Sequence, residues 1–271
     1  MPIRAILFDL DNTLLLEDEA TERALEQTSD LARRRAGADP EAVAAAAREA
    51  AAGVFGASPV FAYADRMGIW WGEALWGRFA GDAHGLAALR AFVPGFRHEV
   101  WTRALSAAAV SDDALVDELA AAYATFRRAL APIDPDALSV LEDLGRDHRL
   151  ALVTNGAPDV QREKLERTTL AKHFAAIVIS AEIGVGKPDP RIFRAALDAL
   201  EVASTEAVMV GDSLERDIVG ARRAGLRSVW LDRAGTAVTG PVAADSRIRS
   251  LRELGDSLIG LERVEAFARP A

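Results

Sequence analysis

Apolar and polar positions follow two different patterns along this chain. Short apolar runs, of the kind found in strands buried on both faces, occur once near the start and then repeatedly after about residue 130. They cover residues 6–8, 150–153, 176–180, 207–210 and 228–231. Apolar residues recur at helical spacing between the later runs, over residues 159–168, 191–200 and 215–224. Strands that alternate with helices predict a parallel sheet, and we expect the first run to join it.

The stretch from about residue 17 to about residue 130 shows only helical spacing. Asp39 and Pro40 have the residue types of an N-cap and a first helical residue, ahead of an alanine-rich helix over residues 41–52. The predicted fold class is therefore α/β, a Rossmann-like parallel sheet core with an inserted all-helical domain. The predicted core covers residues 1–16 and 131–260, the helical insert covers 17–130, and 261–271 form a C-terminal tail.

Composition narrows the possible partners and locations. Of 271 residues, 50% are hydrophobic and 27% are charged, which is typical of a soluble globular enzyme. A net charge of −9 disfavours binding to a nucleic acid polymer or to an anionic membrane. The sequence has no cysteine, which excludes disulfides and thiolate catalysis. Neither a signal peptide nor an apolar run of membrane-spanning length is visible, so we expect a cytoplasmic protein, and the oligomeric state stays open.

Two carboxylates follow the first strand. Asp9 and Asp11 are two residues apart, and side chains at that spacing point the same way on an extended chain. Carboxylates held close together repel each other unless a cation or a proton lies between them. An acidic turn with a purely structural role would have the same sequence, so this stretch alone leaves both interpretations open.

Polar residues of other types follow the later strands. Thr154 and Asn155 end the second, Lys187 lies in the loop after the third, and Asp212 ends the fourth, with Asp217 five residues further on. In an open parallel sheet, ligands bind outside the carboxyl ends of the strands. Carboxylates, a hydroxyl, an amide and a cation together suit phosphoryl transfer, in which the charge of a phosphate has to be neutralised. Asp9 and Asp212 would hold a divalent ion, for which Mg²⁺ is the best match.

Four short segments, residues 9–13, 154–156, 186–190 and 211–217, resemble in order the four motifs of the haloacid dehalogenase-like hydrolase superfamily. The helical insert looks like the C1 cap of that superfamily. The resemblance implies that Asp9 is a nucleophile that forms an aspartyl-phosphate. It implies that Asp11 protonates the leaving oxygen and then activates water. Thr154, the backbone at Asn155 and Lys187 would bind the phosphoryl group.

The resemblance also implies a metal site. Asp9 and Asp212 would bind Mg²⁺ directly, together with the main-chain carbonyl of Asp11. Asp217 would support the ion through its water shell. The structural interpretation is preferred for two neighbours of these residues, since Asp189 and Ser213 have the residue types of helix caps.

The residues distinguish some of the chemistries known in the superfamily. Asp11 favours ester or anhydride hydrolysis, because a halide leaving group needs no proton. Phosphonatases use a lysine in the cap, whereas the lysines here are Lys164, Lys172 and Lys187, all outside the predicted cap. The sequences of the motifs are most similar to those of the branch with N-acylneuraminate-9-phosphatase and pyrimidine nucleotidases.

We expect a Mg²⁺-dependent phosphomonoesterase acting on a small-molecule phosphate ester. A phosphomutase or other phosphoryl-transfer enzyme and a non-catalytic binding or scaffold protein remain the alternatives.

Aromatic residues are concentrated in the predicted cap. Trp70, Trp71 and Trp76 lie close together in the sequence, and aromatics commonly fill the core of a small helical domain. Adjacent helical residues point about 100° apart, so Trp70 and Trp71 are not both expected to be fully buried in one core. These three tryptophans are therefore candidates for recognising an apolar or ring-bearing leaving group.

Overall fold

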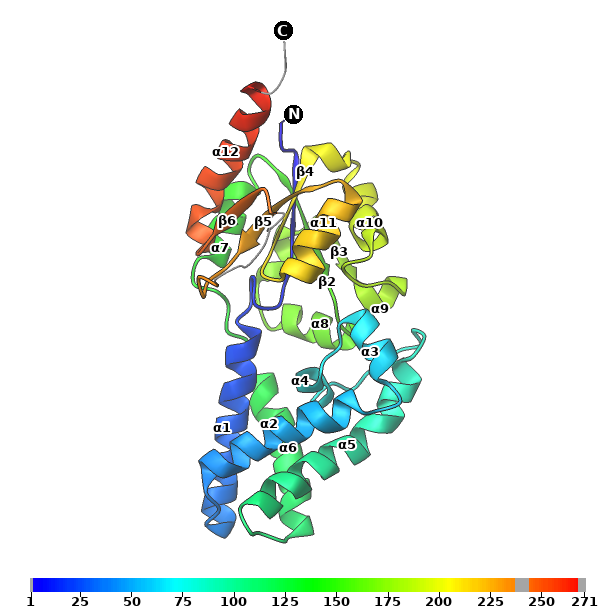
Figure 1. Ribbon diagram of the computed structural model, residues 1–271, viewed down its shortest axis with the longest axis vertical. Helices are drawn as coiled ribbons and strands as arrows, with labels where there is room; N and C mark the ends of the chain where they lie inside the picture. Colours follow the sequence, from blue (N-terminus) through cyan, green and yellow to red (C-terminus); the bar gives the residue numbers. More distant parts are fainter. Residues whose placement is uncertain (1, 237–243, 268–271) are drawn as a thin grey trace. The chain divides into compact units, whose positions relative to one another are not determined.

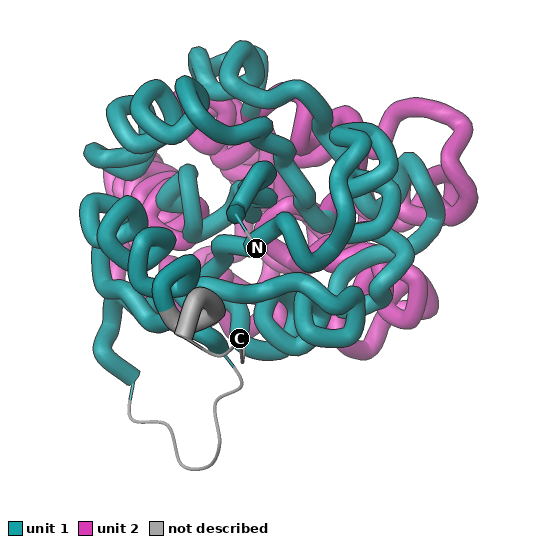
Figure 2. The backbone as a smooth tube through the Cα atoms, turned by 90° about the horizontal axis from the view of Figure 1, so that it is seen from above, with its two compact units in different colours: residues 1–16, 133–155, 165–271 teal, residues 17–132, 156–164 magenta. Residues whose placement is uncertain are grey.

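The computed structural model describes residues 2–236 and 244–267. Figure 2 shows two compact units, one made of residues 1–16, 133–155 and 165–271 and the other of residues 17–132 and 156–164. We call them unit 1 and unit 2. Across the described parts of the chain, each helix is too short or too polar to cross a lipid bilayer.

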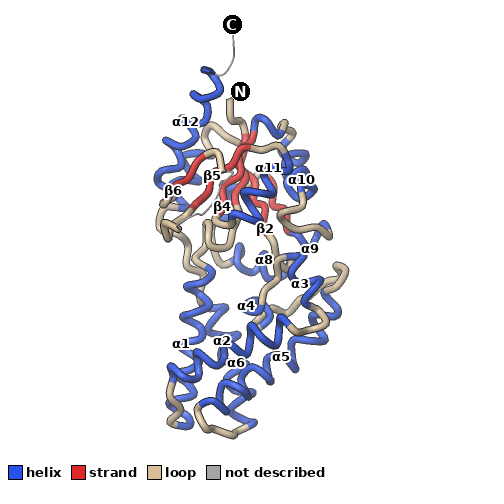
Figure 3. The backbone as a smooth tube through the Cα atoms, viewed as in Figure 1, coloured by secondary structure: helices blue, strands red, loops and turns tan. Residues whose placement is uncertain are grey.

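Unit 1 is built on a parallel sheet, drawn in red in Figure 3. In the described residues its strands are β1 (Ala5–Phe8), β2 (Arg149–Thr154), β3 (Ala176–Ile179), β4 (Ala207–Gly211), β5 (Arg227–Leu231) and β6 (Ser246–Ile248). Their order across the sheet is β3-β2-β1-β4-β5-β6, and each neighbouring pair is parallel. This confirms the predicted α/β class and places β1 at the centre of the sheet.

Alternating side chains of β1 divide the interior of unit 1 into two cores. Ile6 and Phe8 belong to one core, and Ala5 and Leu7 belong to the other. The helices and helical turns of this unit are α7 (Ala137–Leu144), η1 (Leu170–His173), α9 (Ser180–Ile183), α10 (Pro190–Leu200), η2 (Ser204–Glu206), η3 (Leu214–Ile218), α11 (Val219–Ala224), η4 (Leu251–Glu253) and α12 (Leu254–Phe267). Residues of α7 and α12 line the first core, and residues of α10 and α11 line the second. A strand apolar on both faces therefore has a helical layer on each side.

Every regular element of unit 2 among the described residues is a helix. They are α1 (Glu17–Ala36), α2 (Pro40–Gly56), α3 (Phe61–Met67), α4 (Trp71–Ala74), α5 (Leu86–Ala107), α6 (Asp113–Ala129) and α8 (Pro158–Glu166), whose last two residues fall in unit 1. The Asp39 side chain accepts a hydrogen bond from the Glu41 amide, with Pro40 at the first helical position, as the sequence predicts. Large buried aromatics, among them Trp101 and Tyr123, fill the interior.

Four buried charged side chains meet inside unit 2, and we call them the ionic cluster: Glu17, Glu73, Arg127 and Lys164. Glu17 Oε2 lies 2.5 Å from Arg127 Nη2 and 3.3 Å from Lys164 Nζ. Lys164 Nζ also lies 3.2 Å from Glu73 Oε1. Two acids and two bases balance one another in charge, which is the condition under which buried charges are tolerated.

The structure differs from the sequence-based expectations at several elements. Residues 156–164, which the sequence assigned to the core, pack in unit 2, so Lys164 belongs to the helical unit. Helix α7 starts at Ala137, and the Asp134 side chain ahead of it accepts hydrogen bonds from the Asp136 amide and from Arg233. The expected tail begins inside α12, which continues to Phe267, and residues 268–271 lie outside the described residues.

Candidate active site

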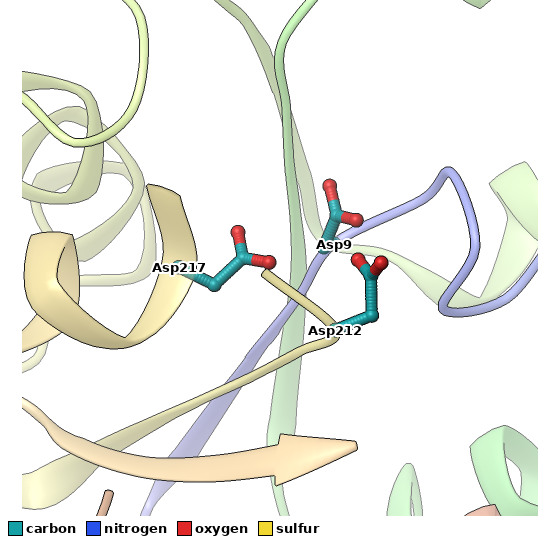
Figure 4. A group of neighbouring side chains, drawn as sticks. All are labelled: Asp9, Asp212 and Asp217. Carbon is teal, nitrogen blue, oxygen red and sulfur yellow. The ribbon is translucent and has the colours of Figure 1, made fainter. Parts of the chain in front are cut away.

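Two acidic residues meet where the central strands end. β1 and β4 pair in register, Phe8 beside Val210, and the Asp9 amide donates to the Val210 carbonyl at 3.0 Å. This register places Asp9 beside Gly211, the residue directly before Asp212. Figure 4 shows their carboxylates facing each other, with that of Asp217 beside them. One oxygen from each of the three carboxylates lies within 4.8 Å of the others.

Lys187 is the cation of this cluster. Its ammonium group lies 2.5 Å from Asp9 Oδ1 and 2.7 Å from Asp217 Oδ1, and its side chain is 3% exposed. The loop that carries it is held by Asn155, whose amide nitrogen donates to the Lys187 carbonyl and whose oxygen accepts from the Lys187 amide. The sequence predicted a phosphate-binding role for the Asn155 backbone, and the structure shows in addition that the Asn155 side chain fixes the lysine loop.

Thr13 joins two of the acids and was missed by sequence reasoning. Its hydroxyl lies 3.3 Å from Asp9 Oδ2 and 3.5 Å from Asp212 Oδ1, and the residue is fully buried. Asp11 lies in the same turn, close enough to raise the pKa of Asp9 through its charge. A buried threonine in a polar turn is the signal that would have indicated Thr13, since a buried hydroxyl needs a partner.

Asp217 approaches the site because residue 211 is a glycine. A Cβ atom at Gly211 would lie 2.3 Å from Asp217 Oδ2, a distance that no side chain at this position could tolerate. Asp217 Oδ2 accepts from the Ser213 amide at 3.0 Å, and the Ser213 hydroxyl accepts from the Arg216 amide at 3.2 Å. Ser213 therefore caps the following turn, in agreement with the structural interpretation of this residue.

Burial and mutual repulsion make the acids reluctant to ionise in the absence of a metal ion. Burial, and then the charges of Asp217 and Asp11, raise the pKa of Asp9 to about 7, although Lys187 opposes the shift. Burial, followed by the charges of Asp9 and Asp217, raises the pKa of Asp212 to about 8. Burial would lower the pKa of Lys187, but the carboxylates of Asp217 and Asp9 outweigh it and raise that pKa.

The donor set fits a hard divalent cation. Mg²⁺ is bound in proteins through one or two carboxylates together with water and substrate oxygens. Asp9 and Asp212 can offer such oxygens, and the cluster brings three carboxylates together around the single ammonium group of Lys187. Asp217 directs one oxygen to the Lys187 ammonium group and the other to the Ser213 amide.

The remaining candidate residues are Thr154 in unit 1 and three tryptophans in unit 2. Thr154 is fully buried at the end of β2, with its hydroxyl 3.3 Å from the Asn155 carbonyl. Trp70 and Trp71 in unit 2 are both partly exposed, with ring centroids 4.8 Å apart. The expected partial exposure is present, but Trp70 has an extended backbone ahead of α4, so the two are not neighbours within one helix. Trp76 is buried beneath the guanidinium groups of Arg127 and Arg128, 5.1 and 5.4 Å from its ring centroid. No described contact tests a substrate role for these tryptophans.

Lys164 bears on phosphonatase chemistry, because phosphonatases use a lysine in the cap. The sequence placed no lysine in the cap, whereas the structure places Lys164 in unit 2. This ammonium group is 4% exposed and lies beside Glu17 and Glu73. A buried lysine held by two carboxylates is poorly suited to Schiff-base formation, which needs a neutral amine that reaches the substrate.

Comparison with known proteins agrees with this site. The haloacid dehalogenase-like hydrolase family matches residues 3–225. A phosphoserine phosphatase of Thermus thermophilus is 41% identical over 253 residues, which cover 93% of this chain and 98% of that protein. N-acylneuraminate-9-phosphatase of Rattus norvegicus is 41% identical over 104 residues, 38% of this chain and 42% of that protein. The pyrimidine 5'-nucleotidase YjjG of Escherichia coli is 37% identical, over 44% of this chain and 54% of its own.

Solved structures agree as well. The HAD-hydrolase YfnB of Bacillus subtilis matches with a TM-score of 0.66 over 95% of this chain and 99% of that one, at 21% identity, which indicates a common fold. A HAD phosphatase of Thermococcus onnurineus matches with a TM-score of 0.58 at 27% identity, over 94% of this chain and 98% of that one. The family match spans all four motif segments and strands β1 to β4 of the sheet. The chain therefore belongs to the haloacid dehalogenase-like hydrolases.

Proposed function

We propose that this protein is a Mg²⁺-dependent phosphomonoesterase that hydrolyses a small phosphorylated metabolite through an aspartyl-phosphate on Asp9. The observation that carries the proposal is the buried group of Asp9, Asp212 and Asp217 around Lys187. A scaffold protein would gain nothing from three buried carboxylates that repel one another. The named phosphatases among the relatives make the chain a hydrolase of phosphoric monoesters.

In the proposed reaction, a carboxylate oxygen of Asp9 attacks phosphorus and the bond to the leaving oxygen breaks. Asp11 gives its proton to that oxygen, so the alcohol leaves neutral, and then takes a proton from the water that attacks the acyl-phosphate. Phosphate leaves and Asp9 is regenerated. Lys187, together with Thr154 and the Asn155 backbone, would bind the phosphoryl oxygens. Mg²⁺ held by Asp9, Asp212 and the Asp11 carbonyl would neutralise phosphate charge and keep Asp9 ionised.

Two classes of leaving group deserve comparison. The relative that matches over nearly the whole length is named a phosphoserine phosphatase, which favours a small amino-acid ester. The partly exposed pair Trp70 and Trp71 favours a ring-bearing leaving group such as a pyrimidine nucleoside. Because unit 2 is covered by the first match, phosphoserine is the first substrate to test.

The test is phosphate release from phosphoserine, a pyrimidine nucleoside monophosphate, phosphoglycolate and p-nitrophenyl phosphate, with Mg²⁺ and after chelation. We expect chelation to abolish turnover, Mg²⁺ to restore it and Ca²⁺ to replace it poorly, since Ca²⁺ prefers a looser and higher coordination. Asp9→Asn should lower kcat by about three orders of magnitude or more while the fold persists, because an amide cannot form the acyl-phosphate. Turnover by Asp9→Asn or by the chelated protein would contradict the proposal.

A further inference from the structure

An arginine outside the four motif segments contacts the turn that carries Asp11. Arg233 follows β5, and its Nη1 donates to the main-chain carbonyl of Asn12 while Nη2 donates to that of Thr13 at 2.8 Å. The same Nη2 lies 2.7 Å from Asp134 Oδ2. One guanidinium group therefore joins two adjacent carbonyls to a carboxylate from a distant part of the chain, which suits the planar, multidentate donor set of arginine.

The turn that Arg233 holds is the one that presents the predicted acid and base. Asn12 directly follows Asp11 and has a φ of 58°, a left-handed conformation that asparagine tolerates better than most residues. The Thr13 hydroxyl lies within reach of Asp9 and Asp212. A donor on each of the two carbonyls of this turn limits how far its peptide groups can rotate, and so fixes the direction in which Asp11 points.

Arg233 also holds the place where the chain returns to unit 1. The Asp134 amide donates to the Leu14 carbonyl at 2.9 Å, and Leu15 forms an isolated bridge with Ile133. The outgoing segment and the returning segment therefore run side by side within unit 1. The contact of Arg233 with Asp134, a residue 7% exposed, ties the returning segment to the catalytic turn.

The backbone from which the Arg233 side chain extends is held in place by hydrogen bonds of Asp232. The Asp232 amide donates to the Ile248 carbonyl at 2.8 Å, and its buried carboxylate accepts from the Thr236 amide and from Arg247. A side chain that extends from a well-held turn can keep its hydrogen-bond partners in a fixed position, whereas one on a loose loop could not.

We propose that Arg233 is a positioning residue for the hydrolysis, holding the Asp11 turn and the returning segment at residue 134 in one arrangement. This inference rests on the proposed function. Arg233 contacts the main-chain carbonyls of Asn12 and Thr13, so its proposed effect on the reaction passes through the backbone of this turn. The effect should be greatest for substrates that depend on the proton from Asp11.

The test is Arg233→Ala, assayed with an alkyl phosphate and with p-nitrophenyl phosphate, whose leaving group needs little protonation. We expect kcat for the alkyl ester to fall by about tenfold or more, kcat for the aryl ester to fall less, and KM to change little. Arg252→Ala is the matched control, because Arg252 forms an ion pair with Asp136 in the same unit and is 77% exposed. This control should leave both rates unchanged.

A second variant separates positioning from folding. Arg233→Lys keeps the charge but offers fewer fixed donors, so we expect a folded protein with the same dependence on leaving group in smaller degree. Equal losses of kcat on the alkyl and the aryl ester in these variants would overturn the proposal. If Arg233→Ala does not fold, wild-type rates in Arg233→Lys would overturn it as well. A wild-type protein inactive on every ester with Mg²⁺ would instead contradict the proposed function.

Discussion

Asp9 lies 2.5 Å from the ammonium group of Lys187 and next to two further acids, so its ionisation depends on which cations are nearby. A nucleophilic carboxylate has to be ionised to attack phosphorus. The pKa of Asp9, about 7 without a metal ion, means that a substantial fraction is protonated near neutrality. A divalent cation would lower this pKa, so in the proposed reaction metal binding and ionisation of Asp9 are linked.

The same linkage predicts how stability depends on pH. The pKa values of Asp9 and Asp212 rise from 3.8 to about 7 and about 8, so the folded, metal-free protein binds more protons than the unfolded chain in that interval. Its free energy of unfolding should therefore fall as pH rises from about 4 to about 8, by an amount on the order of a few kcal/mol. Denaturant unfolding of the chelated protein at about pH 5, 6.5 and 8 would measure this.

Mg²⁺ should reverse this trend, with its stabilising effect increasing toward pH 8, where the two acids release their protons. The control is Asp212→Asn, which removes one repelling carboxylate and should flatten the pH dependence of the metal-free protein. Greater stability of the metal-free wild-type protein at the highest pH would show that the two acids do not repel each other as described.

At the scale of the element, helix α8 depends on the ionic cluster of unit 2. Lys164 lies beside Glu17 of α1 and Glu73 of α4, and Glu17 also pairs with Arg127 of α6, so four helices share one buried set of charges. Replacing Lys164 by Met removes the ammonium group that both buried carboxylates, Glu17 and Glu73, contact. We expect a loss of about 3–5 kcal/mol in the free energy of unfolding, the range for breaking a buried ion pair.

Arg48→Met provides the comparison for this prediction. Arg48 pairs with Glu22 in the same unit, but both side chains are more than 40% exposed, at 43% and 44%. Exposed pairs of this kind contribute at most about 1 kcal/mol. Denaturant unfolding of both variants should therefore separate them clearly, and similar losses would mean that the cluster has no special role in unit 2.

Strands and long helices could be predicted from the sequence, because their signals are local. Residues 150–153 of β2 and 207–210 of β4 are all apolar, as is typical of strands buried on both faces. β6 was missed, since its three residues, Ser246–Ile248, include only one apolar side chain. α12 was not predicted either, although Leu254, Leu258 and Leu261 have helical spacing and are buried.

The acids and the lysine of the candidate site could be predicted from the sequence, but the hydrogen bonds that position them could not. Asp9, Asp212 and Lys187 follow strand ends, and the topology of a parallel sheet brings such positions together. The contacts of Arg233 with the Asn12 and Thr13 carbonyls link residues far apart in the chain. A hydrogen bond between a side chain and a distant carbonyl leaves no periodic pattern in a sequence, so only the structure reveals it.

At the scale of the whole molecule, the chain passes between the two units four times, after residues 16, 132, 155 and 164. The sequence suggested a single insertion, because the change from strand to helical patterning is obvious only near residues 17 and 130. Nothing local distinguishes α8 from the other helices that follow strands. Its assignment to unit 2 depends on its buried neighbours, which come from distant parts of the chain.

This division has a consequence for exchanging modules between relatives. Val160 is 1% exposed and a Cβ atom at Gly77 would lie 2.9 Å from it, so α8 is shaped to the helices of its own unit. A shortened chain in which a Gly-Ser linker replaces residues 17–132 would keep α8 and uncover Val160, Gln161 and Lys164, all buried in the full protein. We expect that chain to associate in size-exclusion chromatography, and Val160→Ser to reduce the association. A monomeric shortened chain would contradict this. A helical unit grafted from a relative should likewise need the donor's own version of residues 156–164, so these enzymes would exchange their helical units as two segments and not as one.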